Sequence, residues 1–162
     1  MDAMSQINLP LDIESLEIIS QEIDKKGNII LHVVSKNVCS TCHKCGKLAT
    51  KRNGTAPPRS IRHLPIFEKP VYLNITPIRY TCEHCDDHPT TTEQYEWCDR
   101  NSSTTKGLDE YILRQLIHST IEDVSKKTTM SCKNIQTILN HHVNTVVDWD
   151  KCKLIESIGL MK

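Results

Sequence analysis

Two cysteine pairs with the spacing Cys-x-x-Cys constrain the fold of this chain more than any other feature of its sequence. One pair is Cys82 and Cys85. The other lies in the stretch CSTCHKCG, where Cys39, Cys42 and Cys45 follow one another at every third position. A Cys-x-x-Cys turn directs both sulfurs toward one metal ion, and two such turns complete a tetrahedral zinc site. The spacing therefore predicts a site of four thiolates, with two candidate pairs for its first half.

The residue that follows each candidate pair favours Cys42 with Cys45. A knuckle turns most easily when the residue after its second cysteine adopts a positive φ, which glycine tolerates without steric cost. Gly46 follows Cys45, whereas His43 follows Cys42, so Cys39 is left as a spare. We predict one structural Zn²⁺ ion bound by Cys42, Cys45, Cys82 and Cys85. Other ligands stay open, namely Cys39, His43, His84, His88 and Cys98, including a Cys3His site in which His84 replaces Cys85.

The N-terminal residues bear on the redox state of these thiols. The chain has 162 residues and eight cysteines, and its start, MDAMSQINLPLDIESLEIIS, is acidic, without a basic n-region or a continuous apolar h-region. This is not the pattern of a signal peptide, and no run approaches the roughly 20 apolar residues of a membrane span. We expect a cytoplasmic protein, in which clustered cysteines bind metal before they form disulfides. A thioredoxin-type redox motif is a rival for one pair, but its strand-to-helix context is missing from these segments.

Positive charge is concentrated in the middle of the chain, although the net charge is zero, with 20 basic and 20 acidic residues. Residues 36–80 contain nine Lys or Arg and one acidic residue, Glu68, while both flanking segments are acidic. Charges beyond about 10 Å are screened at moderate salt, so this segment can attract a polyanion. The alternative is a solvated basic loop. We predict phosphate contacts from Lys44, Lys47, Lys51, Arg52, Arg59, Arg62 and Arg79.

The N-terminal half has the pattern of short strands. Two β-prone runs, 16–23 and 28–34, flank the turn-forming DKKGN and predict a hairpin. Two further runs follow the loop NGTAPPRS, separated by the segment from Pro65 to Pro70, and we expect them to pack as a ribbon that brings both knuckles together. The segment 86–107 is polar and irregular, and its Asn-Ser-Ser-Thr-Thr run, residues 101–105, has the composition of a linker.

Three helices are predicted after residue 107, where the apolar residues change to helical spacing. They cover residues 108–120, 121–127 and 131–149. Thr120 is the expected N-cap of the second helix, with Asp123 in the position of a capping box, and Ser131 is the expected N-cap of the third. The turn between them holds Thr129 where a glycine is common. This pattern predicts a helix-turn-helix, and the alternative is a three-helix bundle with no DNA role.

The third helix is the expected reader of DNA bases. Its Ile and Leu positions face the other helices, and its outward residues can contact base edges in the major groove. Asn and Gln side chains can bind adenine in a bidentate manner, and Lys can reach guanine or phosphate. The candidate contacts are Lys133, Asn134, Gln136 and Thr137.

These elements together predict an α+β chain with a small β-hairpin plus a zinc ribbon, followed by a three-helix helix-turn-helix bundle. The expected domains are residues 1–100, the hairpin and ribbon, and residues 107–150, the helix-turn-helix. Residues 151–162 are a tail. No phosphate-binding loop, nucleophile elbow or His-Glu-x-x-His motif occurs, so no catalytic residue is predicted.

The order of these parts resembles the N-terminal region of bacterial insertion-sequence transposases of the ISL3 family. Their zinc-finger segment typically has Cys-Pro-x-Cys-Gly, then Arg-x-x-Asp-Leu-Pro, then a strand that ends in Arg-Arg-Tyr/Phe-x-Cys. The corresponding segments are 42–46, 62–65 and 78–82, with His43 in place of the usual proline and His63 in place of the usual aspartate.

The resemblance implies a DNA-binding function. In that family a DDE nuclease domain follows the helix-turn-helix, so it implies the DNA-binding part of a transposase, which recognises terminal inverted repeats, without the chemistry. We therefore expect a non-enzymatic, nucleoid-associated protein of the bacterial cytoplasm that binds double-stranded DNA, alone or as a homodimer. The alternative is a zinc-ribbon adaptor that binds another protein and has no direct DNA role. A stand-alone thiol enzyme is a third hypothesis.

Overall fold

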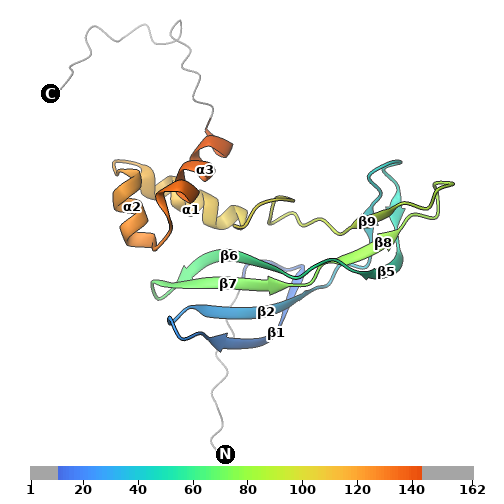
Figure 1. Cartoon of the computed structure of the whole chain (residues 1–162), viewed down its shortest axis with the longest axis horizontal. Helices are drawn as coiled ribbons and strands as arrows, with labels where there is room; N and C mark the ends of the chain where they lie inside the picture. Colours follow the sequence, from blue (N-terminus) through green and yellow to red (C-terminus); the bar gives the residue numbers. More distant parts are fainter. Residues whose placement is uncertain (1–10, 144–162) are drawn as a thin grey trace, which may run out of the picture. The chain divides into compact units, whose positions relative to one another are not determined.

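The computed structural model describes residues 11–143, and these residues form an α+β fold in which strands precede helices (Figure 1). The strands are β1 (Leu16–Ile23), β2 (Ile29–Ser35), β3 (Ser40–Thr41), β4 (Leu48–Ala49), β5 (Lys51–Thr55), β6 (Arg59–Ile66), β7 (Lys69–Ile75), β8 (Ile78–Thr81) and β9 (Thr90–Thr92). The helices are α1 (Lys106–Leu116), α2 (Ile121–Thr128) and α3 (Cys132–His142).

The predicted hairpin is confirmed by β1 and β2, which pair antiparallel. Its turn is stabilised by the carboxylate of Asp24, which accepts hydrogen bonds from the backbone N–H groups of Lys26 and Asn28 at 2.8 and 2.9 Å. The hairpin is not a separate unit, however. It forms one side of a four-stranded sheet with the order β1-β2-β7-β6, in which β2 and β7 are parallel.

The two runs between the knuckles pair with each other as expected, as β6 and β7, and the structure adds that they also join the hairpin in one sheet. The separating segment was shorter than predicted, since Pro65 and Pro70 lie inside the strands. The turn consists of Phe67 and Glu68, with φ of 47° and 63°. Both prolines are tolerated because β6 is an edge strand whose register shifts after His63, and Pro70 precedes the part of β7 that pairs with β2.

The core of the four-stranded sheet is aliphatic, and the polar segment 86–107 helps to close it. The buried strand residues are Leu16, Leu31, Val33, Ile61, Val71, Leu73 and Ile75. Tyr95 and Cys98 are buried in the same cluster, and Trp97 packs against it. The predicted linker, residues 101–105, follows these buried residues and leads into α1. In this segment the Thr104 hydroxyl donates to the buried carboxylate of Asp109, a residue of α1, at 2.6 Å.

Two smaller sheets carry the cysteine pairs. One is the two-stranded ladder of β3 and β4, and the other has the order β5-β8-β9. Only Thr76 and Pro77 separate β7 from β8, so the chain passes directly from the large sheet into the small one (Figure 1). The two small sheets share a cluster of buried Cys42, Ala49, Tyr80 and Cys82.

The helices begin and end where the sequence provides caps. Contacts divide the chain into two compact units, the first ending at Arg114 and the second beginning at Gln115. In the first unit, Thr105 starts α1 by accepting a hydrogen bond from the Leu108 N–H at 3.3 Å. In the second, Thr120 and Ser131 cap α2 and α3 as predicted.

None of the helices between residues 11 and 143 is long and apolar enough to cross a membrane.

The predicted turn between the last two helices is confirmed, and α2 and α3 contact each other. Thr129 adopts the left-handed conformation, with φ of 53° and ψ of 29°, at the position where glycine is common. The third helix was predicted too long. It ends at His142, and Val143 is extended; the rest of the prediction, including Trp149, lies outside the described residues.

Candidate metal centre and nucleic-acid interface

The first knuckle is a tight turn between β3 and β4. The N–H of Gly46 donates to the Cys42 carbonyl at 3.0 Å, and the N–H of Cys42 donates to the Lys47 carbonyl at 2.8 Å. Gly46 has a φ of 71°, which confirms the reason for choosing Cys42 and Cys45 as the pair.

The second knuckle follows β8 and leads toward β9. The N–H of Cys82 donates to the Pro89 carbonyl, and the N–H of His88 donates to the Cys85 carbonyl, both at 3.0 Å. These bonds hold the turn that carries Cys82 and Cys85, because the pairing of β8 with β9 fixes both ends of it.

Four sulfur atoms, one from each of Cys42, Cys45, Cys82 and Cys85, lie within 4.8 Å of one another. The Sγ–Sγ distance is 3.6 Å from Cys45 to Cys82, 3.8 Å from Cys82 to Cys85 and 4.0 Å from Cys42 to Cys85. A tetrahedron with Zn–S bonds of about 2.3 Å has edges of about 3.8 Å. The four thiols therefore fit one structural zinc ion without rearrangement of either knuckle.

Backbone N–H groups lower the pKa of one of these thiols, that of Cys42. The N–H groups of Cys45 and Lys44 point toward the Cys42 sulfur and lower its pKa to about 6. The pKa of Cys85 is raised to about 12, mainly by the neighbouring thiol of Cys45, because four thiolates cannot coexist this closely without a cation. Zinc supplies that cation, and its binding releases the remaining protons.

The other candidate ligands do not join this cluster, which is the only group of its kind within residues 11–143. The His43 Nδ1 lies 2.9 Å from the Thr91 hydroxyl, and the His88 Nδ1 lies 3.1 Å from the Cys82 carbonyl. Cys98 belongs to the core of the large sheet. A Cys3His site is therefore not the arrangement that the structure presents.

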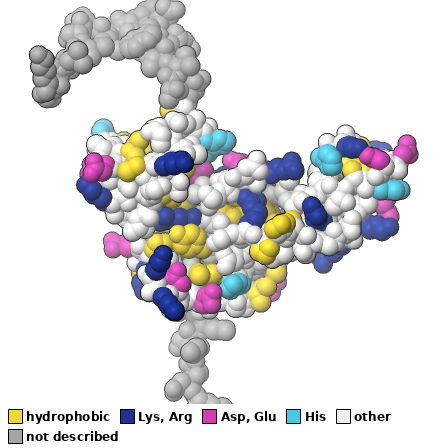
Figure 2. All heavy atoms as spheres, viewed as in Figure 1, with side chains coloured by type: hydrophobic (Ala, Val, Ile, Leu, Met, Phe, Trp, Pro, Cys, Tyr) yellow, Lys and Arg dark blue, Asp and Glu magenta, His cyan; other side chains and the backbone are white. Residues whose placement is uncertain are grey.

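Basic residues in and near the first knuckle form ion pairs with acidic residues of the second. Lys44 forms an ion pair with Asp87, and Lys51 lies 3.4 Å from the Glu83 carboxylate. Figure 2 shows basic, acidic and histidine side chains intermixed at the end of the molecule that carries these small sheets. These ion pairs are exposed and so contribute little free energy, which leaves the cations able to exchange partners. Lys47, Arg52 and Arg79 are also exposed.

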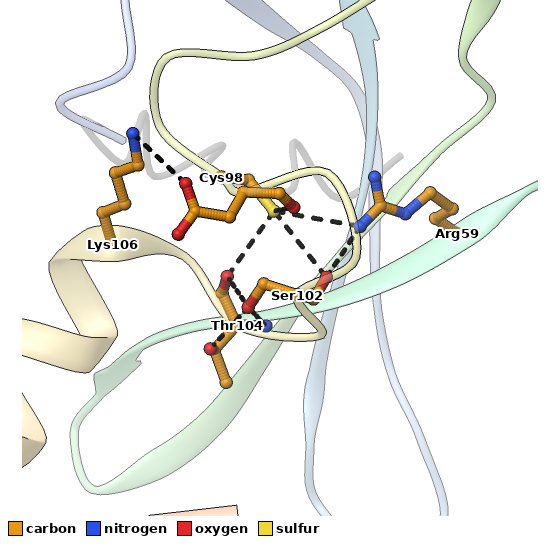
Figure 3. Close-up of polar contacts among 6 residues, drawn as sticks. Arg59, Cys98, Ser102, Thr104 and Lys106 are labelled. Carbon is orange, nitrogen blue, oxygen red and sulfur yellow. Dashed lines mark hydrogen bonds and ion pairs between the residues drawn. The ribbon is translucent and has the colours of Figure 1, made fainter. Parts of the chain in front are cut away.

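Two of the predicted phosphate contacts are engaged within the first unit. The Arg59 guanidinium points to Cys98 and Ser102, and it donates to the Ser102 carbonyl at 2.6 Å (Figure 3). The Arg62 guanidinium is half-buried, with its carbon 6.0 Å from the centre of the Tyr72 ring, and burial lowers its pKa. These two side chains bind the segment before α1 and the surface of the large sheet.

The predicted base-contacting residues all lie exposed on α3, while Ile135 and Ile138 of the same helix are buried. The Gln136 Nε2 donates to the Asn140 Oδ1 at 2.8 Å, which orients the Gln136 amide. The Thr137 hydroxyl donates to the Lys133 carbonyl at 2.9 Å, so its proton is used within the helix. The exposed set is Lys133, Asn134, Gln136 and Thr137.

Sequence reasoning missed the acidic partners of the knuckle lysines. Glu83 lies between the two cysteines of the second pair and Asp87 follows them in TCEHCDD, while Lys44 lies between the cysteines of the first pair in CHKCG. Because one metal ion joins the two knuckles, opposite charges in their loops are brought close together. The opposite charges of the two loops were the feature of the sequence from which these ion pairs could have been predicted.

Two family models match the chain. Residues 39–85 match the zinc-finger of transposase IS204/IS1001/IS1096/IS1165, and residues 93–143 match the helix-turn-helix domain of transposase family ISL3. No curated protein and no solved structure matches. The first model spans both knuckles, and the second spans α1, α2 and α3 together with the segment before them. Residues 39–85 and 93–143 therefore belong to the zinc-ribbon and helix-turn-helix domains of ISL3-family transposases.

Proposed function

We propose that this chain is a sequence-specific DNA-binding module of a transposase and that it recognises the terminal inverted repeats of a mobile element. The observation that carries the proposal is the N-terminal half of α3. It follows a tight turn, exposes four polar side chains, and lies in the segment matched by the helix-turn-helix model. In helix-turn-helix proteins this part of the second helix of the motif contacts base edges in the major groove.

The side chains on α3 have the chemistry that base reading requires. Asn134 and Gln136 each offer an amide that can bind adenine in a bidentate manner, and Lys133 can reach guanine or a phosphate. The bond from Gln136 to Asn140 supports the proposal, because it selects one orientation of the Gln136 amide before DNA arrives.

The zinc ribbon would contribute phosphate contacts that hold the module on the duplex. Its exposed cations are Lys44, Lys47, Lys51, Arg52 and Arg79, and with Lys133 they number six. If six cations meet phosphates, the slope of log affinity against log salt is about −5. Arg59 and Arg62 are left out because their guanidinium groups are engaged within the fold.

The experiment is a selection from random duplexes, followed by measurement of the affinity of zinc-loaded chain for the selected site between about 50 and 200 mM salt. We expect an enriched motif and an affinity that falls steeply with salt. An affinity that barely changes, or a selection that enriches no motif, would contradict the proposal. Gel filtration of the complex would show whether a homodimer binds.

A protein-binding adaptor is the second candidate, and two exposed apolar residues near the first knuckle favour it. Val38 is 71% exposed and Leu48 is 59% exposed. A pull-down that retains a protein partner but no nucleic acid after nuclease treatment would support the adaptor.

The remaining parts of the proposal concern the whole protein. Neither matched model is a catalytic domain. The parent would be a DDE transposase whose nuclease domain supplies the chemistry, and binding to the ends of a mobile element would place it at the nucleoid.

A further inference from the structure

One face of the β5-β8-β9 sheet consists of cations, hydroxyls and an amide. In antiparallel pairs, residues directly opposite each other share a face. Lys51 pairs with Thr81 and Thr81 pairs with Thr90, so these three form a row across the sheet. Arg79 pairs with Thr92 in a second row on the same side, since it lies two positions from Thr81.

Asn53, in the β5 bulge, lies on the same face of the sheet. The register of β5 shifts between Arg52 and Thr55, so pairing alone does not place Asn53. A side-chain contact places Asn53 on this face, because the Asn53 Nδ2 donates to the Thr90 Oγ1 at 3.1 Å. We call Lys51, Asn53, Arg79, Thr81, Thr90 and Thr92 the threonine face.

The other side of the sheet is the inner side. Tyr80 and Thr91 pair with each other there, and both are buried. The β3–β4 ladder covers this side, because buried Ala49 shares a cluster with Tyr80 and the His43 N–H donates to the Thr91 hydroxyl. Arg52 pairs with Tyr80, so it lies on the inner side although it neighbours Lys51 in the sequence.

The threonine face is open to solvent and suited to bind anions. Lys51, Asn53, Arg79 and Thr90 are exposed, and Thr81 and Thr92 are half-buried. Glu83 is the acidic side chain that contacts the face, through its exposed ion pair with Lys51. Because the Thr90 oxygen accepts from Asn53, its hydroxyl proton is free to be donated to another acceptor.

We propose that the threonine face docks on the sugar–phosphate backbone of duplex DNA. Lys, Arg, Thr and Asn side chains are usual donors to phosphate oxygens, and the threonine face presents all four kinds on one side of the sheet. The proposal rests on the proposed function, and it adds the four residues Asn53, Thr81, Thr90 and Thr92. It also removes Arg52 from the six cations counted for the proposed function, because Arg52 lies on the opposite side of the sheet and is not expected to contact the phosphates.

The test uses two matched pairs of variants in the full zinc-loaded chain. Arg79→Ala removes an exposed cation from the threonine face. Arg52→Ala, its control, removes an exposed cation from the inner side of the same sheet. Thr90→Glu and Thr41→Glu each add one negative charge at an exposed threonine, the second on the β3–β4 ladder. Binding to a labelled random duplex is measured by fluorescence anisotropy across the same salt range, with zinc content as the control for folding.

We expect Arg79→Ala to reduce the magnitude of the salt slope by about 0.9, the value for one phosphate contact, and Arg52→Ala to leave it unchanged. Thr90→Glu should weaken binding more than Thr41→Glu. If the two variants of each pair changed the salt slope or the affinity equally, while the wild-type chain still bound DNA, the threonine face would not be the docking surface. The proposed function would be unaffected. Failure of the wild-type chain to bind any duplex would contradict the proposed function itself.

Discussion

The Sγ atoms of Cys45 and Cys82 lie 3.6 Å apart, although 37 positions separate the two residues in the chain. Of the strands between them, β6 and β7 belong to the large sheet, whereas β5 and β8 pair with each other and bring the two ends of this segment together. The two knuckles meet around a small cluster in which Tyr80 is the one aromatic residue. Because this cluster is small, a metal ion that joins the two knuckles is expected to stabilise this part of the fold strongly.

Replacing any of the four clustered cysteines should abolish zinc binding. We expect Cys42→Ser, Cys45→Ser, Cys82→Ser and Cys85→Ser each to lower the zinc content from about one ion per chain, because a structural site needs four ligands. Cys39→Ser is the matched control and should retain zinc, since Cys39 lies outside the cluster. Metal analysis of purified protein measures the effect, and stoichiometric zinc in the Cys45→Ser protein would refute the assignment.

Removal of zinc by a chelator should loosen the small sheets and spare the large one. Amide hydrogen exchange should become faster in β3, β4, β5, β8 and β9, while β1, β2, β6 and β7 stay protected by their own aliphatic core. Equal loss of protection in all strands would show that the four-stranded sheet also depends on the metal.

The local features of this fold could be predicted from the sequence, because short-range rules determine them. The knuckle pair followed from Gly46, and the helix caps followed from Thr120 and Ser131. Each depends on residues within four positions of one another.

The long-range features could not be predicted in this way. The parallel pairing of β2 with β7 joins strands that are far apart in the chain, and hydrophobic pattern does not specify a partner. The burial of Tyr95 and Cys98 could not be predicted, because their sequence neighbours are polar. The hydrogen bonds of such neighbours, as from Thr104 to Asp109, depend on the tertiary structure. The threonine face depends on the register of β5, β8 and β9, which places Lys51 and Arg52 on opposite sides.

Thr129→Gly should stabilise the second unit. Thr129 has a φ of 53°, a conformation that glycine adopts without the steric penalty of a Cβ. We expect the free energy of unfolding to rise by about 0.5–1 kcal/mol, measured by denaturant titration. Thr41→Gly, at an exposed strand position, is the control and should be destabilising. A loss of stability in the Thr129→Gly protein would show that the threonine side chain supports the turn.

Stability should fall in mild acid because of His63. This side chain is buried beside Thr105, with its Nδ1 3.0 Å from the Thr105 hydroxyl, and burial lowers its pKa below the ordinary 6.5. The unfolded chain then binds a proton at higher pH than the folded chain does. The stabilisation is therefore complete above about pH 6.5 and is lost as the pH falls toward the lowered pKa.

His63→Asn removes the titrating group and keeps a polar atom near the Nδ1 position. Thermal unfolding between about pH 7 and pH 5 should show a smaller pH dependence for this variant than for the wild type. His118→Asn, at an exposed position with a φ of 61°, should leave the dependence unchanged. An identical pH dependence in the wild type and the His63→Asn protein would contradict the role of this histidine.

The most direct test of the account compares affinities for a selected duplex and a random duplex. Asn134→Ala and Gln136→Ala should each weaken binding to the selected site by about 1–3 kcal/mol and change binding to random DNA little, because base contacts specify sequence. Lys51→Ala should weaken both alike, because a phosphate contact carries no sequence information. If the α3 variants weakened both duplexes equally, α3 would not be the reader of sequence, and the central claim would be contradicted.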